Sequence, residues 1–80
     1  MTEEEVFDRL AAIVRDVLMR DDVKLTPETT ARDVAGWDSF KMLEIIISAE
    51  ERFGIQMGTS DLDKLKNVGD LARSILGKLG

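Results

Sequence analysis

The stretch that decides the fold is 35-AGWDSFKMLEIIISAEERFG-54, because it holds a helix start, an apolar run and a helix stop in order. Asp38 and Ser39 are residue types favoured at helix starts, where their side-chain oxygens accept free backbone N–H groups. Gly54 is a good C-terminal stop. The stretch therefore predicts a helix over residues 39–52 that ends at Gly54.

This helix carries apolar residues on both of its sides. At helical spacing one side forms a complete core stripe: Met42, Ile45, Ile46, Ala49 and Phe53. The other side carries Phe40, Leu43 and Ile47 among Glu44 and Glu51. We expect Leu43 to be buried, since it lies nearest the core stripe, and Phe40 and Ile47 to be partly exposed. The alternative is a second buried seam under a loop. An exposed apolar strip edged by carboxylates suits a partner groove edged with Lys or Arg.

The remainder of the chain predicts three more helices and no strand. A capping-box pair, Thr2 and Glu5, begins a helix over 3–20, and Asn67 with Asp70 begins one over 68–79. A short helix is plausible over 60–65. Residues 21–37 form a long connection in which 26-TPE-28 resembles a helical turn. The expected fold is all-α: one domain over 1–80, a small four-helix bundle with three longer helices, one short helix and a long first loop.

Composition excludes several functions. The formal net charge is −5, which disfavours nucleic acid as a partner. There is no His and no Cys, so the usual general base and thiol nucleophile are missing and a stand-alone enzyme is not expected. No stretch has calcium-loop spacing, and no apolar run approaches the roughly 18 residues of a membrane span. The acidic N-terminus does not resemble a signal peptide, so we expect a cytoplasmic monomer without a metal or stable membrane association.

The sequence allows two interpretations of Ser39. It is either part of an ordinary helix start, or a residue that carries a phosphate-type group. The first turn of a helix suits the second role, because its free N–H groups and positive dipole end stabilise a negative charge. Glutamates further along the same helix would offer a modifying enzyme a surface to hold.

The segment 36-GWDSFKMLEIIISAEERFGIQM-57 closely resembles the acyl carrier protein family, whose phosphopantetheine-attachment motif is usually Gly-x-Asp-Ser-Leu followed by an amphipathic helix. The resemblance covers essentially the whole chain. It includes the acidic first helix, the long first loop and the start of the last helix, 67-NVGDL-71.

The resemblance implies a carrier and not a catalyst. A phosphopantetheinyl transferase would place 4′-phosphopantetheine from coenzyme A on Ser39, with Asp38 helping to position the metal or cofactor of the transferase. Acyl- or aminoacyl-loading enzymes and acyl-transferring or condensing enzymes would follow as partners. Partner-contacting positions of the family helix match Phe40, Leu43, Glu44, Ile47 and Glu51. Candidates for an acyl pocket are Ile45, Ile46, Ala49, Phe53 and Ile75.

Three residues depart from the family pattern. Phe40 replaces the usual Leu, Lys41 lies where central fatty-acid carriers usually have an acid, and Trp37 replaces a small residue. They favour a dedicated carrier for a polyketide, a peptide, a modified lipid or another special acyl group over a role in general fatty acid biosynthesis. A peptidyl or aminoacyl carrier and a non-covalent helical interaction module, with Ser39 only a helix cap, remain the alternatives.

Overall fold

The computed structural model describes residues 1–58 and 65–79, and within them the chain is all-α. Helix α1 spans Glu3–Leu18, the 3-10 turn η1 spans Ala31–Asp33, α2 spans Ser39–Phe53 and α4 spans Val68–Leu79. The all-α prediction is confirmed. The short helix predicted over 60–65 falls outside the described residues except for Leu65, which is not helical.

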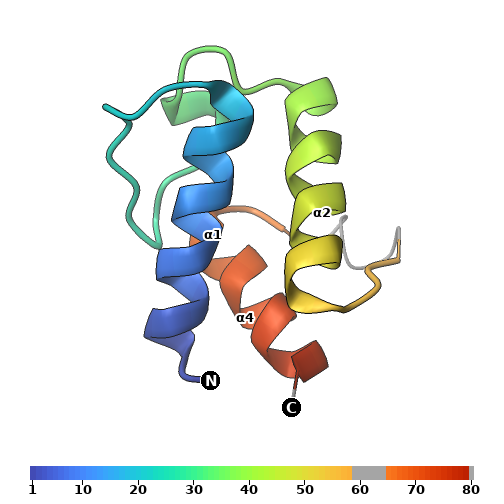
Figure 1. Ribbon diagram of the computed structural model, residues 1–80. Coiled ribbons are helices and arrows are strands. Elements are labelled where there is room, and N and C mark those ends of the chain that lie inside the picture. The colour runs from blue at the N-terminus through green and yellow to red at the C-terminus, as the bar shows by residue number, and fades with distance from the viewer. Residues whose placement is uncertain (59–64, 80) are drawn as a thin grey trace.

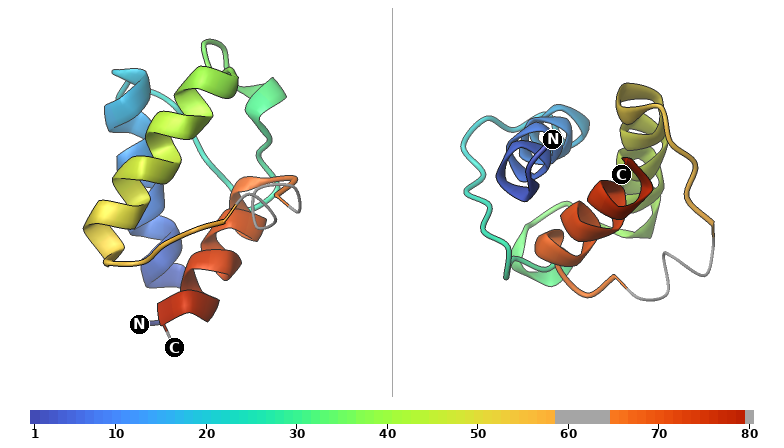
Figure 2. Two further views of the ribbon diagram at one scale, coloured as in Figure 1. Left: turned by 90° about the vertical axis from the view of Figure 1, so that its right-hand side faces the viewer. Right: turned by 90° about the horizontal axis from the view of Figure 1, so that it is seen from below.

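Helix α1 is the centre of the packing, because it contacts both α2 and α4. Figure 1 shows α1 and α2 side by side, with α4 tilted across them, and the view from below in Figure 2 places the three helices around a shared interior. The connection between α1 and α2 passes around the outside of α1 and returns to the start of α2. Within the described residues, three helices therefore enclose one core.

The helix ends follow the predicted capping chemistry with small shifts. The capping box of α1 is present: the Glu5 N–H donates to Thr2 Oγ1 at 3.2 Å, and the Thr2 N–H donates to the Glu5 carboxylate at 3.0 Å. At α4, the Asp70 N–H donates to Asn67 Oδ1 at 2.8 Å. Helix α1 ends two residues before the predicted Arg20, because Met19 takes the left-handed conformation with φ of 56°. Helix α2 runs one residue past the predicted end.

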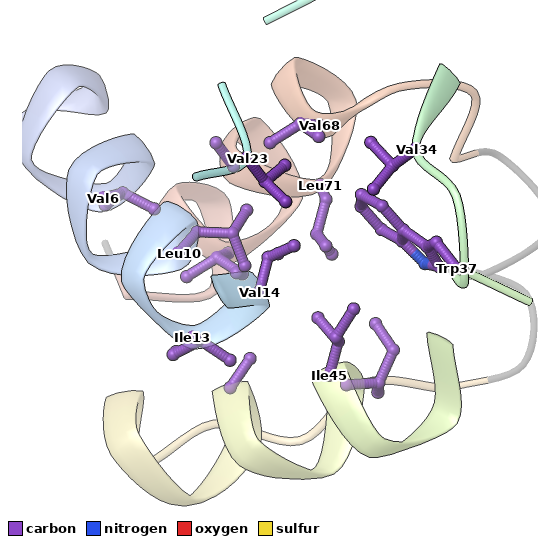
Figure 3. Close-up of a cluster of buried hydrophobic side chains, with 14 residues drawn as sticks. Val6, Leu10, Ile13, Val14, Val23, Val34, Trp37, Ile45, Val68 and Leu71 are labelled. Carbon is purple, nitrogen blue, oxygen red and sulfur yellow. The ribbon is translucent and has the colours of Figure 1, made fainter. Parts of the chain in front are cut away.

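The core combines the predicted stripe of α2 with buried apolar side chains of α1, α4 and the long connection. Figure 3 shows side chains of α1, α2 and α4 meeting those of Val23, Val34 and Trp37. The Arg15 Nε–H also donates to the Val23 carbonyl at 2.9 Å. The connection thus packs as part of the fold. The turn at Pro27 is closed by a hydrogen bond from the Thr29 N–H to the Thr26 carbonyl, whereas the helical turn η1 comes later than predicted.

The first turn of α4 is held against this connection. The Val68 N–H donates to the Thr29 carbonyl and the Gly69 N–H donates to the Pro27 carbonyl, each at 2.9 Å. The approach is close: a Cβ on Gly69 would lie 2.8 Å from the Pro27 carbonyl oxygen. Glycine at position 69 is therefore needed for contact between backbones and not for an unusual φ.

We expect Gly69→Ala to lower the free energy of unfolding by about 1–3 kcal/mol, because the added methyl group forces the helix and the turn apart. Gly77→Ala is the matched control in the same helix, since a Cβ there meets no atom within 4 Å. Alanine's higher helix propensity should make that variant more stable by about 0.5 kcal/mol. Urea titrations measure the free energy of unfolding of both variants. Equal changes of the same sign would contradict the close approach of Gly69 to the Pro27 carbonyl.

Candidate functional site

The start of α2 is capped by Asp38 and not by Ser39. The Asp38 Oδ1 accepts the Lys41 N–H at 2.9 Å, and the Asp38 carbonyl accepts the Met42 N–H at 2.9 Å. Ser39 is the first residue inside the helix and is exposed. The alternative in which Ser39 serves as the cap is therefore wrong, since the cap hydrogen bond belongs to its neighbour.

The Ser39 hydroxyl is left available for chemistry. Within residues 1–58 and 65–79 this hydroxyl makes no hydrogen bond. It lies in the first turn of α2, where the N–H groups of Ser39 and Phe40 precede the helix's own hydrogen bonds. These groups and the helix dipole favour a negative charge on an attached group. An exposed hydroxyl and the positively polarised start of a helix thus coincide at Ser39.

A cavity of about 780 Å³ lies next to Ser39, between the start of α2, η1 and the start of α4. Ser39, Asp38 and Trp37 lie along it, and two cationic residues, Arg32 and Lys66, also line it. Apolar side chains form most of its wall: Met42, Leu43, Ile46, Leu65, Val68 and Leu71. The volume lies in the range of about 300–1,000 Å³ that small-molecule pockets have. The wall suits an alkyl chain and the two cations suit a phosphate.

The acyl-pocket candidates are distributed over three places. Ile46 lines the cavity next to Ser39. Ile45, Ala49 and Ile75 are fully buried in the shared core and line none of the cavities described. Phe53 lines a smaller cavity of about 270 Å³ at the other end of α2.

Sequence reasoning did not assign Trp37, Met42 or Leu71 to this cavity. Two signals were present in the sequence. Met42 belongs to the predicted core stripe of α2, and Leu71 lies at helical spacing from Val68 and Ile75 in the last predicted helix. Only the packing of α4 against the connection shows that these positions meet beside Ser39.

The outward side of α2 carries a strip, called here the outer strip, that consists of Phe40, Leu43, Glu44, Ile47 and Glu51. The predicted exposure of Phe40 and Ile47 is confirmed, at 68% and 54%. The predicted burial of Leu43 is wrong, because it is 53% exposed. Leu43 lies at the edge of the cavity, where no described side chain covers it. The outer strip thus combines three exposed apolar side chains with two carboxylates, and Leu43 joins it to the cavity beside Ser39.

The carboxylates along α2 have different surroundings. Glu44 is half-buried and pairs with Lys41 at 3.6 Å between Nζ and Oε2. Glu50 accepts the Met57 N–H at 2.9 Å, so it holds the chain that leaves the helix. Glu51 is exposed. The strip thus offers one open carboxylate and one that is partly neutralised within the chain.

Asp70 fixes the segment that closes the cavity on the side of α4. The Arg73 guanidinium donates to its carboxylate at 2.6 Å and the Lys66 N–H donates to it at 3.1 Å. These bonds, that from Arg73 first, lower the pKa of Asp70 below its ordinary value. The Asp70 carboxylate thus holds the backbone of Lys66 beside the cavity. No group of three or more metal-ligating side chains occurs in the described part of the chain.

Comparison with known proteins agrees with this geometry. A profile of the family described as "Phosphopantetheine attachment site" matches residues 8–75, which include the start of α2. The acyl carrier protein of Thermotoga maritima is 32% identical and covers 99% of this chain and 98% of its own length. The meromycolate extension acyl carrier protein of Mycolicibacterium smegmatis is 34% identical over 92% of this chain and 75% of its own length.

A solved structure shows the same fold. The holo acyl carrier protein of Geobacter metallireducens, determined by solution NMR, superposes with a TM-score of 0.87 at 42% identity, over 92% of this chain and 85% of that one. No helix within residues 1–58 and 65–79 has the length and apolar character needed to cross a bilayer. With the family profile, the full-length relatives and the common fold in agreement, this chain belongs to the acyl carrier protein family and is a carrier of acyl groups on 4′-phosphopantetheine.

Proposed function

We propose that Ser39 is the residue that carries 4′-phosphopantetheine. The observation that supports it is the exposed Ser39 hydroxyl, free of the capping bond and placed beside an apolar cavity. We further propose that residues 1–80 form one carrier domain that works in the cytoplasm. Its partners are a phosphopantetheinyl transferase and the enzymes that load and receive the acyl group.

The residues around Ser39 fit a 4′-phosphopantetheine group. When bound, it supplies the thiol that holds acyl groups as thioesters, which this chain without cysteine lacks. The N-terminus of α2 stabilises the negative phosphodiester, and Arg32 and Lys66 add positive charge at the same cavity. Asp38 orients the first turn through its cap bond and presents a carboxylate to the transferase.

We propose a specialised pathway for this carrier. Trp37 and Phe40 give the site a large aromatic residue on either side of the Asp-Ser pair, and Lys41 neutralises part of the outer strip through Glu44. A relative is named for meromycolate extension, which is one instance of specialised lipid synthesis within the family. A peptidyl or aminoacyl carrier is the second candidate, and loading by an adenylating enzyme would distinguish it.

The test is an intact-protein mass spectrum of the purified chain before and after incubation with coenzyme A, magnesium and a broad-specificity phosphopantetheinyl transferase. We expect a gain of one phosphopantetheinyl group, and tandem mass spectrometry of a digest should place it on the peptide that contains Ser39. A folded chain that gains nothing with several transferases, or gains the group elsewhere, would overturn the assignment.

The outer strip yields a separate prediction about partners. Glu44→Lys should lower the rate of modification by the transferase at low salt, because a basic partner then meets a positive charge beside Lys41. The deficit should shrink as salt rises, since exposed charges are screened within about 8–10 Å at ordinary ionic strength. The measurement is the initial rate of modification as a function of sodium chloride concentration.

Glu28→Lys is the matched control, because it makes the same change of charge at an exposed position in the connection. It should leave the rate nearly unchanged at every salt concentration. An equal loss in both variants would mean that overall charge, and not the outer strip, governs the encounter.

A further inference from the structure

Met19, the residue that closes α1, is unusual in its exposure and in its backbone conformation. Its side chain is 88% exposed, more than any other large apolar side chain in the described part of the chain. It is also the one residue other than glycine within residues 1–58 and 65–79 that has a positive φ, at 56°. A side chain makes this conformation costly, so glycine or asparagine is the usual residue at such a helix end.

The backbone alone performs the structural role of this position. The Met19 N–H donates to the carbonyls of Arg15 and Asp16, which closes the last turn of α1 with bonds that glycine would also make. The exposed side chain gains no burial that would offset its cost. A conformational outlier without a structural return points to a function. Methionine suits protein recognition, because its flexible side chain adapts to the surface it meets.

Met19 lies at the same end of the molecule as Ser39. Helices α1 and α2 run in opposite directions, so the end of α1 and the start of α2 lie side by side in Figure 1. The Arg20 guanidinium joins the two, because it donates to the carbonyl of Ala35 at 3.3 Å, four residues before Ser39. Asp21 is exposed and makes no hydrogen bond or ion pair within residues 1–58 and 65–79.

A partner that reaches Ser39 needs more surface than the outer strip. The outer strip is one face of one helix, whereas each side of a specific protein interface contributes roughly 20–30 residues. The end of α1 extends the available surface on the other side of the attachment site. It repeats the chemistry of the outer strip, with an exposed apolar side chain, Met19, next to an open carboxylate, Asp21.

We propose that Met19 is an anchor for the phosphopantetheinyl transferase, which contacts this chain on both sides of Ser39. The inference rests on attachment at Ser39. The complementary surface of the transferase is an apolar recess edged by Lys or Arg, because Asp21 on one side and Glu51 on the other are open carboxylates. Met19 thus retains a costly conformation because its side chain is used in docking.

The test separates docking from stability with two substitutions that favour the left-handed conformation. Met19→Gly and Met19→Asn should raise the urea midpoint of unfolding, since both residues adopt this conformation readily. The KM of the transferase for either variant should nevertheless rise about threefold to tenfold at an unchanged kcat, as expected for lost docking contacts. Met19→Leu keeps an apolar side chain and should leave KM within about twofold of wild type.

Leu79→Asn is the matched control. It removes another exposed apolar side chain, at the end of α4 on the opposite end of the molecule (Figure 1), and should leave KM unchanged. A second readout needs no catalysis. When transferase is added to the ¹⁵N-labelled chain without coenzyme A, the amide signals of Met19 and Asp21 should shift together with those of Phe40 and Ile47.

The outcomes are distinct. Equal KM values for wild type and Met19→Gly would overturn the docking role, whatever the change in stability. Shifts confined to α2 in the titration would overturn it as well. A change in sedimentation of Met19→Gly with an unchanged KM would assign Met19 to a contact between copies of the chain, against this proposal. A wild-type chain whose mass shows no modification at Ser39 would overturn the proposed function too, whereas normal modification with equal KM values would overturn this inference alone.

Discussion

Ser39→Ala is expected to abolish transfer of the phosphopantetheinyl group completely while leaving the free energy of unfolding within about 0.5 kcal/mol of wild type. Alanine removes the hydroxyl that would form the phosphodiester. It does not remove a cap, because Asp38 accepts the Lys41 N–H. Intact mass spectra and urea titrations of the same preparations measure the two effects.

Two substitutions of Asp38 are the controls for the Ser39→Ala variant. Asp38→Ala should cost about 1 kcal/mol of stability through loss of the cap. Asp38→Asn keeps a capping oxygen and removes the charge, so its stability should stay near that of wild type. A slower transfer to the Asp38→Asn variant would then report the contribution of the carboxylate to recognition by the transferase.

Two outcomes would contradict the assignment. Continued modification of Ser39→Ala would place the attachment elsewhere. A loss of stability as large as that of Asp38→Ala would mean that Ser39 has a structural role at the start of α2, which its surroundings do not indicate.

Ile45→Ala is expected to have the largest effect on stability, a loss of about 2–5 kcal/mol. Ile45 is fully buried in the core shared by the three helices, so truncation leaves a cavity that the surrounding side chains cannot fill (Figure 3). For a chain of 80 residues this is a large part of the total stability. Thermal or urea unfolding followed by circular dichroism measures it.

Ile47→Ala is the matched control, because it makes the same truncation two residues away on the same helix. Ile47 is 54% exposed on the outer strip, so its loss should change stability by less than about 0.5 kcal/mol. Its effect should appear instead as slower modification by the transferase. If Ile47→Ala destabilised the chain as much as Ile45→Ala, the outer strip would belong to the core.

Much of the fold could be predicted because it depends on local chemistry. The capping pair Thr2–Glu5, the stop at Gly54 and the repeat of apolar residues in each helix all act over a few neighbouring residues. The same holds for the start of α2, where an Asp-Ser pair in a family pattern indicated the candidate site. Local signals also placed Phe40 and Ile47 on the exposed side.

Other features depend on parts of the chain that are distant in sequence, and the tertiary structure decided them. The sequence shows Trp37 only as an unusual neighbour of Asp38, but packing buries its indole and leaves the N–H without a partner. Packing likewise leaves Leu43 half exposed and makes Gly69 the point where α4 meets the Pro27 carbonyl. A helical wheel gives the direction of a side chain and not what lies opposite it. The cavity beside Ser39 therefore exists only because the connection and α4 close around the start of α2.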